Sequence, residues 1–435
     1  MKPLNTVAFH TLGCKVNQYD TQAMLELFRA AGYAVVPFHS KADVYVLNTC
    51  TVTGTGDKKS MQITRRLRRE YPDSEIILCG CLAQRKGEAL LETGARVILG
   101  TQRRGEVVTL LEQAVREDRQ ICAVDALTTA TPFENLVITD QEEHTRATLK
   151  IQEGCNNHCT YCIIPSVRGP IRSRPLADIA DESARLAQAG FRELVLTGIH
   201  LSSYGKDLQD GTTLLDAIQA VQDTQGILRI RLGSLEPTIA TEEFSARLAR
   251  MDKVCPQFHL ALQSGSDTVL ARMARRYNTR MYLQAVDNLR AAFPRAAFTT
   301  DVLTGFPGET EEEYQETRRM IETVGYAKIH VFPYSQREGT KAAVMPGQLP
   351  NALKDQRARE LIALGEITAH AYQESWLGRT APVLLEEQDA EGRWLGYTPE
   401  YIQVTLPDCP ACRSGETVQV LLTAIHQDGM KGELA

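Results

Sequence analysis

Short apolar runs alternate with amphipathic stretches over about the first 130 residues. Residues 7–11, 43–48 and 75–80 have the length and composition of strands. Residues 20–31 and 58–70 have the periodicity of helices. Strands separated by helices of this length indicate a parallel sheet, so this region is predicted to be a Rossmann-like α/β domain.

Strand and helix units continue beyond residue 145. Apolar runs that predict strands lie near Leu149 and at residues 193–198, 229–234, 258–263, 297–304 and 328–332. These are fewer units than a closed (β/α)8 barrel has. The sequence therefore predicts a partial (β/α)6 barrel, whose open side suits a large substrate such as folded RNA.

The chain changes character again from about Tyr372. Short strand-like runs separated by turn residues predict a small antiparallel β-barrel. Residues 132–144 are polar around one apolar island, 136–138, and are typical of an exposed connector. These changes predict domains at residues 1–138, 139–371 and 372–435.

Composition limits the class of protein. The 435 residues are 43% hydrophobic and 23% charged, which is ordinary for a globular protein. No apolar run approaches the roughly 20 residues of a membrane span, and the first ten residues lack the pattern of a signal peptide. We therefore expect a cytoplasmic protein with no membrane partner.

The net charge of −6 gives no general attraction to nucleic acid. Any RNA contact must come from local basic clusters, for which a solvated helix face is the alternative interpretation. The second cluster follows a predicted strand end, which places it nearer the expected site. The two clusters are Arg65, Arg66, Arg68 and Arg69, and Arg272, Arg275, Arg276 and Arg280.

Three thiols with C-x3-C-x2-C spacing, Cys155, Cys159 and Cys162, directly follow the strand near Leu149. Three ligands on one loop hold a 4Fe-4S cube by three corners and leave the fourth iron open for a substrate. A zinc site that includes His158 is the alternative, although zinc ligands usually come in two separated pairs. In a chain with eleven cysteines and no secretory signal, metal ligands or buried thiols are favoured over disulfides.

The loop, with Tyr161 just before its last cysteine, resembles the cluster loop of the radical S-adenosylmethionine (SAM) enzymes. The resemblance implies that the open iron binds the amino and carboxylate groups of SAM. It also implies that an electron from the cluster cleaves SAM to give a 5'-deoxyadenosyl radical. In such enzymes the cofactor carries the difficult chemistry and the protein positions it.

Three further cysteines, Cys14, Cys50 and Cys81, each lie just past a predicted strand of the first domain. Loops at the carboxyl ends of parallel strands converge, so these thiols are expected to meet at one point. Chance placement of buried cysteines is the alternative. Cys79, two residues before Cys81, is expected to point into the core.

The segments TLGCKVN at 11–17, NTCTVT at 48–53 and GCLAQ at 80–84 resemble the cysteine motifs of the methylthiotransferase family. The resemblance covers essentially the whole chain. It implies a second 4Fe-4S cluster on Cys14, Cys50 and Cys81, a second SAM as methyl donor, and a C-terminal RNA-binding TRAM barrel. It further implies transfer of a methylthio group to an unactivated carbon in a cavity that both clusters share.

Polar residues at the strand ends of the partial barrel are candidates for binding SAM or substrate. For each of them, a turn or helix cap is the alternative. The candidates are Tyr161, Thr197, Gly198, His200, Ser234, Glu236, Gln263, Ser264, Ser266 and Asp301.

Substrate contacts are also predicted outside these strand ends. Arg275 and Arg276 are candidates for an RNA or carboxylate contact, and Trp394 is a candidate for stacking on bases, as are Tyr397 and Tyr401. Most aromatics in so small a barrel belong to its core, which is the alternative. Cys409 and Cys412 lack a second cysteine pair and are interpreted as part of an exposed loop.

Family members differ in substrate. The segment LTGIHLSSYG at 196–205 and the motifs around Cys14 and Cys50 are most similar to the branch that acts on threonylcarbamoyladenosine (t6A) in tRNA. The resemblance implies tRNA, at its anticodon stem-loop, as partner and a flavodoxin or ferredoxin as electron donor. Modification of isopentenyladenosine, modification of a ribosomal protein aspartate, and a non-catalytic iron–sulfur RNA-binding protein remain as alternatives.

Overall fold

The computed structural model describes residues 4–139 and 145–435. Its N-terminal part is a parallel sheet with the strand order β2-β1-β3-β4-β5-β6. The strands are β1 (Thr6–Thr11), β2 (Ala34–Val35), β3 (Val44–Thr49), β4 (Glu75–Gly80), β5 (Val97–Leu99) and β6 (Ile121–Ala123). The helices are α1 (Lys15–Ala30), α2 (Gly54–Glu70), α3 (Cys81–Lys86), η1 (Gly87–Thr93), η2 (Arg104–Glu106) and α4 (Val107–Arg116).

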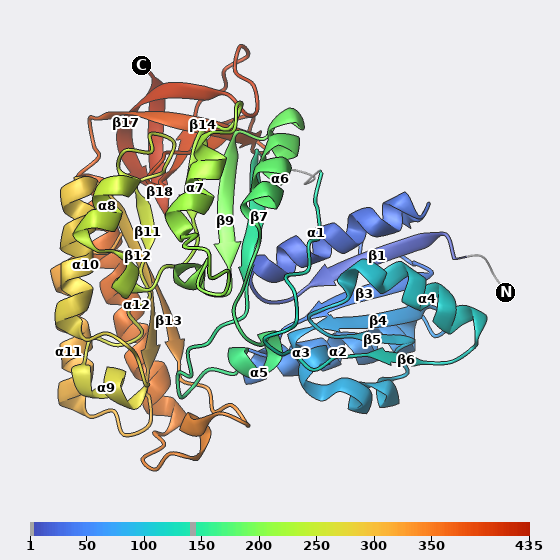
Figure 1. The fold of residues 1–435 in the computed structure, drawn as a ribbon. Coiled ribbons are helices and arrows are strands. Elements are labelled where there is room, and N and C mark those ends of the chain that lie inside the picture. Colours follow the sequence, from blue (N-terminus) through green and yellow to red (C-terminus); the bar gives the residue numbers. More distant parts are fainter. Residues whose placement is uncertain (1–3, 140–144) are drawn as a thin grey trace.

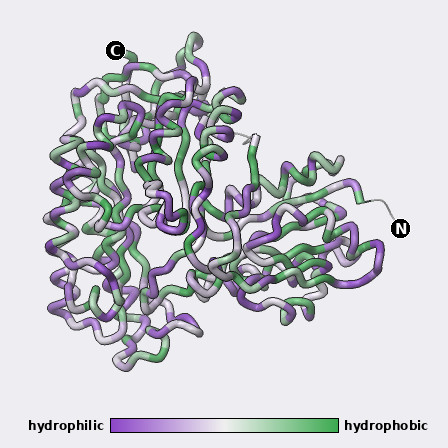
Figure 2. The backbone as a smooth tube through the Cα atoms, viewed as in Figure 1, coloured by the Kyte–Doolittle hydropathy of each residue, from purple (hydrophilic) through white to green (hydrophobic). Residues whose placement is uncertain are grey.

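Both faces of this sheet are covered, because its central strands are apolar on both sides. In β3, every residue of which is buried, Val46 packs with Phe28 of α1 and Leu111 of α4. Leu47, on the opposite face, packs with Leu67 of α2. Hydrophobic positions accordingly run through the middle of the sheet in Figure 2. The predicted Rossmann-like domain is confirmed.

The central part is a partial barrel built from two sheets, β10-β9-β7-β8 and β11-β12-β13, which a bridge between Leu235 and Leu260 joins. Its strands are β7 (Arg146–Glu153), β8 (Arg172–Ser173), β9 (Glu193–Gly198), β10 (Arg229–Leu232), β11 (Gln257–His259), β12 (Ala297–Thr304) and β13 (Lys328–Pro333). Its α-helices are α5 (Ile164–Arg168), α6 (Leu176–Gln188), α7 (Leu214–Gln222), α8 (Glu242–Leu248), α9 (Asp267–Arg272), α10 (Thr279–Ala292), α11 (Glu311–Val324) and α12 (Asn351–Glu374). The short turns η3 (Leu201–Ser203), η4 (Pro237–Ile239) and η5 (Lys341–Val344) complete it.

Side chains alternate across each strand of the partial barrel. Leu149 of β7 and Leu196 of β9 pack with Leu186 of α6 in the core beneath the helices. The alternate residues of each strand therefore point to the inside of the barrel. Lys150 of β7 and Thr197 of β9 are among them, so the inside is polar. β13 is an edge strand whose residues are all partly or fully exposed, so the predicted open side is present.

The C-terminal part is a closed barrel with the order β14-β15-β16-β18-β17. Arg229 at the start of β10 donates to the carbonyls of Tyr397 and Pro382 at 2.8 and 2.9 Å. The barrel therefore covers the amino ends of the central strands, and the arrows of β7 and β9 point away from it (Figure 1). Its strands are β14 (Thr380–Gln388), β15 (Trp394–Tyr397), β16 (Gln403–Leu406), β17 (Thr417–His426) and β18 (Gly429–Leu434).

The segment expected to be an exposed connector is partly buried. Leu136 and Ile138 belong to the core of the central domain, with exposed fractions of 7% and 0%. The prediction of exposure was wrong there because the apolar island fills a gap beside α6. Residues 140–144 of this connector lie outside the described residues. No described helix is long and apolar enough to cross a membrane.

Candidate active site between two cysteine loops

The C-x3-C-x2-C loop leaves the carboxyl end of β7 and borders a cavity of about 150 Å³. Gly154 makes this exit possible, because it has a positive φ of 73° and a Cβ there would lie 1.9 Å from the Pro170 carbonyl oxygen. Cys155, Cys159 and Cys162 all line the cavity. Burial raises the pKa of Cys155 to about 11 and that of Cys162 to about 12. The neighbouring thiols add to both shifts, so the three sulfurs lie close together.

The loop does not form the alternative zinc site. His158 is exposed, and among the described residues no three Cys, His, Asp or Glu side chains gather closely enough to hold a single metal ion. Ligands of a 4Fe-4S cube bind different iron atoms, so they do not need to meet at one point.

Glu236, in the loop after β10, contacts side chains from three other segments that line the cavity. Its carboxylate accepts from Asn157 in the cysteine loop at 3.2 Å, and it lies 3.1 Å from His200 Nε2 and 3.3 Å from Arg275 Nη2. Burial opposes its ionisation, but the hydrogen bond and charge of His200 and the charge of Arg275 lower the pKa of Glu236 to about 2. The cavity therefore holds one fixed carboxylate at neutral pH. Asn157, which sequence reasoning missed, stands between the motif cysteines, and that position was its only signal.

The predicted site residues divide into two groups. Tyr161, His200, Ser234, Glu236 and Arg275 line the cavity. The others lie nearby without lining it, and several have structural partners. Thr197 is buried, and Gly198 has no room for a Cβ beside Gln152. The hydroxyl of Ser264 bonds to Thr317, and that of Ser266 bonds to Thr268. Gln263 donates its backbone NH to the Asp301 carbonyl, and the Asp301 carboxylate lies 3.6 Å from His259.

Cys14, Cys50 and Cys81 follow the adjacent strands β1, β3 and β4. A Cβ on Gly13 would lie 3.0 Å from Cys50 Sγ, which places the first two loops in contact. Burial raises the pKa of Cys81 to about 11, Arg168 opposes this shift, and the charges of Cys14 and Cys50 add to it. The three cysteines thus share one corner of the sheet. Cys79 is fully buried in the core.

Arg168 connects this corner to the first loop. It ends α5, which begins two residues after Cys162, and it is fully buried. Its Nε donates to Cys81 Sγ at 3.1 Å, and its Nη1 lies 2.9 Å from Glu153 and 3.2 Å from Asp20. The segment 155–168 therefore carries three candidate cluster ligands and also the arginine that donates to Cys81 in the other cysteine group.

A buried ionic network holds the two domains together. Asp20 of α1 pairs with Lys150 of β7 at 2.5 Å, and also with Arg104 and Arg168. Burial opposes ionisation, but these three cations lower the pKa of Asp20 to about 2. A second contact is made by Arg337, which lies 2.6 Å from Asp57 and donates to the Thr51 hydroxyl beside Cys50.

Of the two arginines predicted to contact substrate, Arg275 is engaged within the protein, and the RNA contact of Arg276 stays a prediction. The Arg275 side chain is buried against Glu236, Tyr277 and Cys159, so it is not free to take a substrate carboxylate. Arg276 is exposed but does not line the cavity.

The aromatics of the C-terminal barrel also have structural roles. Trp394 is only 8% exposed, because its ring fills the barrel core, so it presents no face for a base. Tyr397 and Tyr401 stack on each other at 4.8 Å, and Arg146 of β7 lies over both rings. They are therefore engaged where the barrel meets the central domain.

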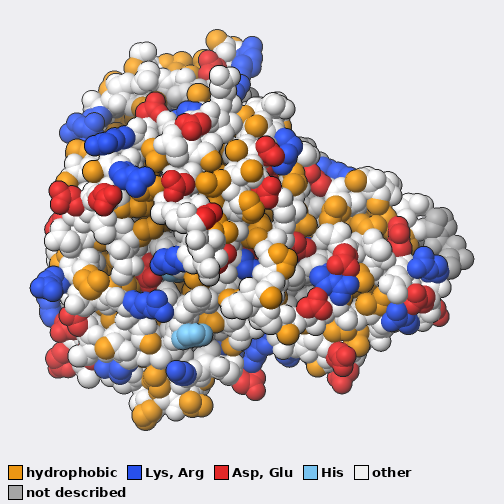
Figure 3. Space-filling model, in the orientation of Figure 1, with side chains coloured by type: hydrophobic (Ala, Val, Ile, Leu, Met, Phe, Trp, Pro, Cys, Tyr) orange, Lys and Arg blue, Asp and Glu red, His pale blue; other side chains and the backbone are white. Residues whose placement is uncertain are grey.

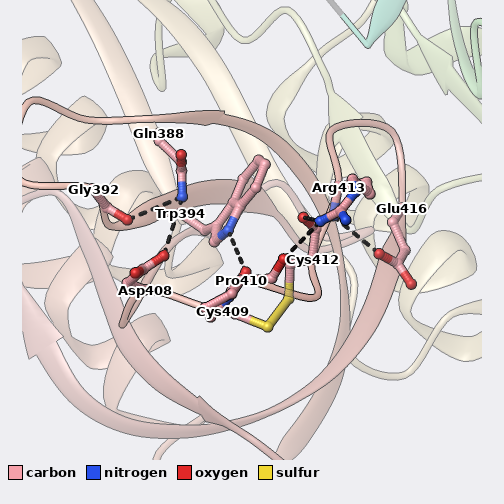
Figure 4. The surroundings of a disulfide bond; sticks show 9 residues. All are labelled: Gln388, Gly392, Trp394, Asp408, Cys409, Pro410, Cys412, Arg413 and Glu416. Atoms are coloured by element: carbon pink, nitrogen blue, oxygen red, sulfur yellow. Dashed lines mark hydrogen bonds between the residues drawn. A yellow bond between two sulfur atoms is a disulfide. The ribbon is translucent and has the colours of Figure 1, made fainter.

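Cys409 and Cys412 form a disulfide beside Trp394, whose indole NH donates to the Cys409 carbonyl at 3.3 Å (Figure 4). The loop is exposed at Asp408, Pro410 and Ala411, as predicted, whereas Cys412 is buried against the barrel core. The bridge closes a short turn within the loop between β16 and β17, and this turn contacts the barrel through Cys412 and the Trp394 hydrogen bond.

The chain resembles known proteins over nearly all its length. Residues 149–321 match the radical SAM superfamily, and residues 6–100 match a family described as uncharacterized protein family UPF0004. Among solved structures, the radical SAM methyltransferase TsrM from Kitasatospora setae, with cobalamin and a 4Fe-4S cluster bound, is similar with a TM-score of 0.58 and 14% identity. That likeness covers 79% of this chain and 74% of TsrM and shows a shared fold. The fold and the three-cysteine loop define a radical SAM enzyme, a class that binds a 4Fe-4S cluster and SAM.

Curated relatives show which family of radical SAM enzymes the chain belongs to. The protein named threonylcarbamoyladenosine tRNA methylthiotransferase MtaB in Bacillus subtilis is 42% identical over 404 residues, covering 92% of this chain and 90% of that protein. The Thermotoga maritima protein of the same name is 32% identical, with 98% and 96% covered. A Syntrophobacter fumaroxidans protein named tRNA-2-methylthio-N(6)-dimethylallyladenosine synthase is 35% identical, with 98% and 94% covered. The chain belongs to the methylthiotransferase family of radical SAM enzymes.

Proposed function

We propose that this chain converts t6A at position 37 of tRNA, next to the anticodon, to 2-methylthio-t6A. The observation that carries the proposal is the 42% identity with the B. subtilis MtaB protein over nine-tenths of both chains. The open side of the partial barrel supports it, because a base on a folded RNA needs a wide entrance.

The two groups of cysteines fit two 4Fe-4S clusters, each held by three thiolates. The proposed division is a cluster domain at 1–138, a radical SAM domain at 139–371 and a TRAM domain at 372–435. The fit rests on the donor sets. One group offers three sulfurs on a single loop, and the other offers three sulfurs on converging loops. Each group also receives a buried arginine NH, from Arg275 to Cys159 and from Arg168 to Cys81. When bound, one cluster supplies the electron that cleaves SAM, and the other holds the sulfur that a second SAM methylates.

The residues of the cavity position SAM beside the first loop. Ser234 offers a hydroxyl group, while Ile199 and Ala261 offer apolar surface for an adenosyl group. Glu236 fixes His200 and Arg275, so both side chains keep one orientation.

Lys15 is proposed as the partner of the t6A carboxylate. It follows Cys14 directly, is exposed and has no ion-pair partner among the described residues. The pKa of Lys15 is lowered, chiefly because the surrounding protein excludes water from its ammonium group. The charges of Arg231 and Arg146 lower this pKa further, and the charge of Glu193 opposes the shift. These groups lie on the inner faces of β10, β7 and β9, so Lys15 lies near enough to the interior of the partial barrel to be affected by their charges. It takes the role that Arg275, engaged elsewhere, does not fill.

An RNA surface is proposed along α2, which begins four residues after Cys50. A hollow of about 540 Å³ between α2 and the end of α3 is lined by Asp57 and by five basic side chains: Lys58, Arg65, Arg66, Arg69 and Lys86. On the face drawn in Figure 3, in contrast, acidic and basic side chains are interspersed. With the anticodon loop at the cavity, the phosphates of the stem would follow α2. The electron donor is proposed to be a flavodoxin or ferredoxin, and the location the cytoplasm, where tRNA is modified.

The proposal is tested with purified protein whose clusters have been reconstituted under anaerobic conditions. Anticodon stem-loops that carry t6A or isopentenyladenosine are incubated with it, SAM, a sulfur source and a reductant. The digested nucleosides are then analysed by mass spectrometry. We expect 2-methylthio-t6A and little product from the second RNA, and a Cys159→Ala protein serves as the inactive control. If only the isopentenyladenosine RNA gives product, the proposed substrate becomes isopentenyladenosine. The 35% identity with the S. fumaroxidans protein favours this second candidate.

A further inference from the structure

Two buried arginines, Arg168 and Arg275, each contact one cysteine sulfur, and the two sulfurs belong to different cysteine groups. Arg168 Nε donates to Cys81 Sγ at 3.1 Å, and Arg275 Nη1 donates to Cys159 Sγ at 3.2 Å. Both side chains are held inside the protein, since the exposed fraction is 0% for Arg168 and 9% for Arg275.

The remaining NH groups of each arginine are held by other partners, so each guanidinium has a fixed plane. Arg168 is held by Asp20, Glu153 and the Asn17 side-chain oxygen. Because Asn17 follows Cys14 by one turn of α1, Arg168 contacts the surroundings of two of the three cysteines in that corner.

Arg275 is held in the same manner by fewer partners. Its Nη2 lies 3.3 Å from Glu236, its Nε donates to the Tyr277 hydroxyl at 3.0 Å, and its guanidinium lies 4.8 Å from the centre of that ring. One carboxylate thus faces Arg275, whereas two face Arg168. The net local charge near the two sulfurs therefore differs.

Hydrogen bonds to ligand sulfurs and nearby charge are among the factors that set the reduction potential of an iron–sulfur cluster. An NH aimed at a thiolate stabilises the reduced cluster more than the oxidised one, because the reduced cluster carries more negative charge. Two clusters that are each held by three cysteines need such differences if only one of them is to reduce SAM.

We propose that Arg168 and Arg275 are positioning residues that act through Cys81 and Cys159, and that each sets the reduction potential of one cluster independently of the other. The part that concerns Arg168 rests on the proposed second cluster. Arg168 also makes that cluster dependent on the radical SAM domain, because the donor comes from α5 and not from the domain that supplies the thiols.

The test is a redox titration followed by electron paramagnetic resonance, on full-length protein that holds one cluster at a time. Cys155, Cys159 and Cys162 are replaced together by Ala to leave the cluster on Cys14, Cys50 and Cys81, and the reverse set leaves the other. Arg168→Lys and Arg275→Lys are introduced into each background, since lysine keeps the charge but not the planar donor.

We expect Arg168→Lys to lower the midpoint potential only of the Cys14, Cys50 and Cys81 cluster. We expect Arg275→Lys to lower only that of the other. A tenfold weaker preference for the reduced state corresponds to a shift of about 59 mV for one electron. Iron content is measured on every sample, because a lost cluster gives no potential.

Arg104→Lys is the matched control. Arg104 lies in the same buried network, pairing with Asp20 and Glu134, and within the described part of the chain it has no hydrogen bond to a cysteine sulfur. It is expected to change stability without changing either potential. Unchanged potentials in both arginine variants, or equal shifts in Arg168→Lys and Arg104→Lys, would overturn the inference while leaving the proposed function intact. A wild-type protein that binds iron only at Cys155, Cys159 and Cys162 would overturn both.

Discussion

At the scale of single residues, Glu236 organises the cavity because three elements share it as an acceptor. Asn157, His200 and Arg275 come from the cysteine loop, the end of β9 and the turn after α9. The carboxylate is only 7% exposed, and leaving a buried arginine without this partner is costly. It therefore orients the cavity wall more than it contacts the reacting groups.

Glu236→Gln is predicted to weaken SAM binding by roughly ten- to a hundredfold, because the amide removes the charge that fixes Arg275. The measurement is equilibrium dialysis of SAM with reconstituted protein. Glu243→Gln, at an exposed position of α8, is the control. Since the pKa of Glu236 is lowered from 4.5 to about 2, its stabilising effect is complete above pH 4.5 and declines only as the pH falls toward 2. The difference between the two proteins should thus be constant near neutral pH, and equal SAM affinities would contradict this role.

Lys15→Ala is predicted to raise the KM for a t6A stem-loop by roughly ten- to a hundredfold, because one charge-assisted hydrogen bond to the carboxylate is lost. SAM cleavage without RNA should stay unchanged. Lys41→Ala, an exposed lysine of the same domain, is the control. A similar KM for both variants would show that another residue binds the carboxylate.

At the scale of elements, α1 links the two domains. Its N-cap is Cys14, and one and a half turns later Asp20 enters the ionic network with Lys150 of β7 and Arg168 of α5. Removing one partner of such a buried network leaves charges that nothing compensates. The position of Cys14 relative to the radical SAM loop therefore depends on Asp20.

Asp20→Asn is predicted to reduce stability by about 3–5 kcal/mol at neutral pH. The measurement is the urea midpoint, compared with that of Asp118→Asn, an exposed carboxylate. The pKa of Asp20 is lowered from 3.8 to about 2, so its contribution is present above pH 3.8 and is lost as the pH falls toward 2. The gap between wild type and variant should close over that range. A gap that is unchanged at acid pH would show that Asp20 is not ionised in the folded protein.

Replacing Arg65, Arg66 and Arg69 of α2 with Glu is predicted to weaken tRNA binding and to reduce its salt dependence by about one unit of slope per lost phosphate contact. Filter binding at several salt concentrations measures both. The control replaces Arg116, Arg247 and Arg319, three exposed arginines elsewhere, with Glu and makes the same change in net charge. Equal effects of the two sets would mean that only net charge matters.

Apolar periodicity and strand-end chemistry predicted most of the elements and the two cysteine groups, because both depend on local sequence. The partner of each arginine was not predictable, since Arg168 and Cys81 are 87 residues apart and meet only when the domains pack. Arg275 was expected to face substrate and is instead paired with Glu236. Trp394 was expected to face RNA, but aromatic composition does not distinguish a core ring from an exposed one.

At the scale of the whole molecule, the C-terminal barrel and the cysteine loops lie at opposite ends of the central strands (Figure 1). Arg229 and Arg231 bind backbone carbonyls of that barrel at the amino ends of the strands. The N-terminal domain packs beside β7, so its cysteine corner lies next to the cavity. The substrate is therefore expected to enter from the open side, between α2 and β13.

The most direct test of the central claim is nucleoside mass spectrometry on tRNA from cells with and without the gene. The account predicts that 2-methylthio-t6A disappears, that t6A accumulates, and that the wild-type gene restores the product while a Cys50→Ala gene does not. Loss of the methylthio-isopentenyl nucleoside instead would keep the chemistry and reject the substrate. Unchanged tRNA would contradict the account and direct attention to a ribosomal protein.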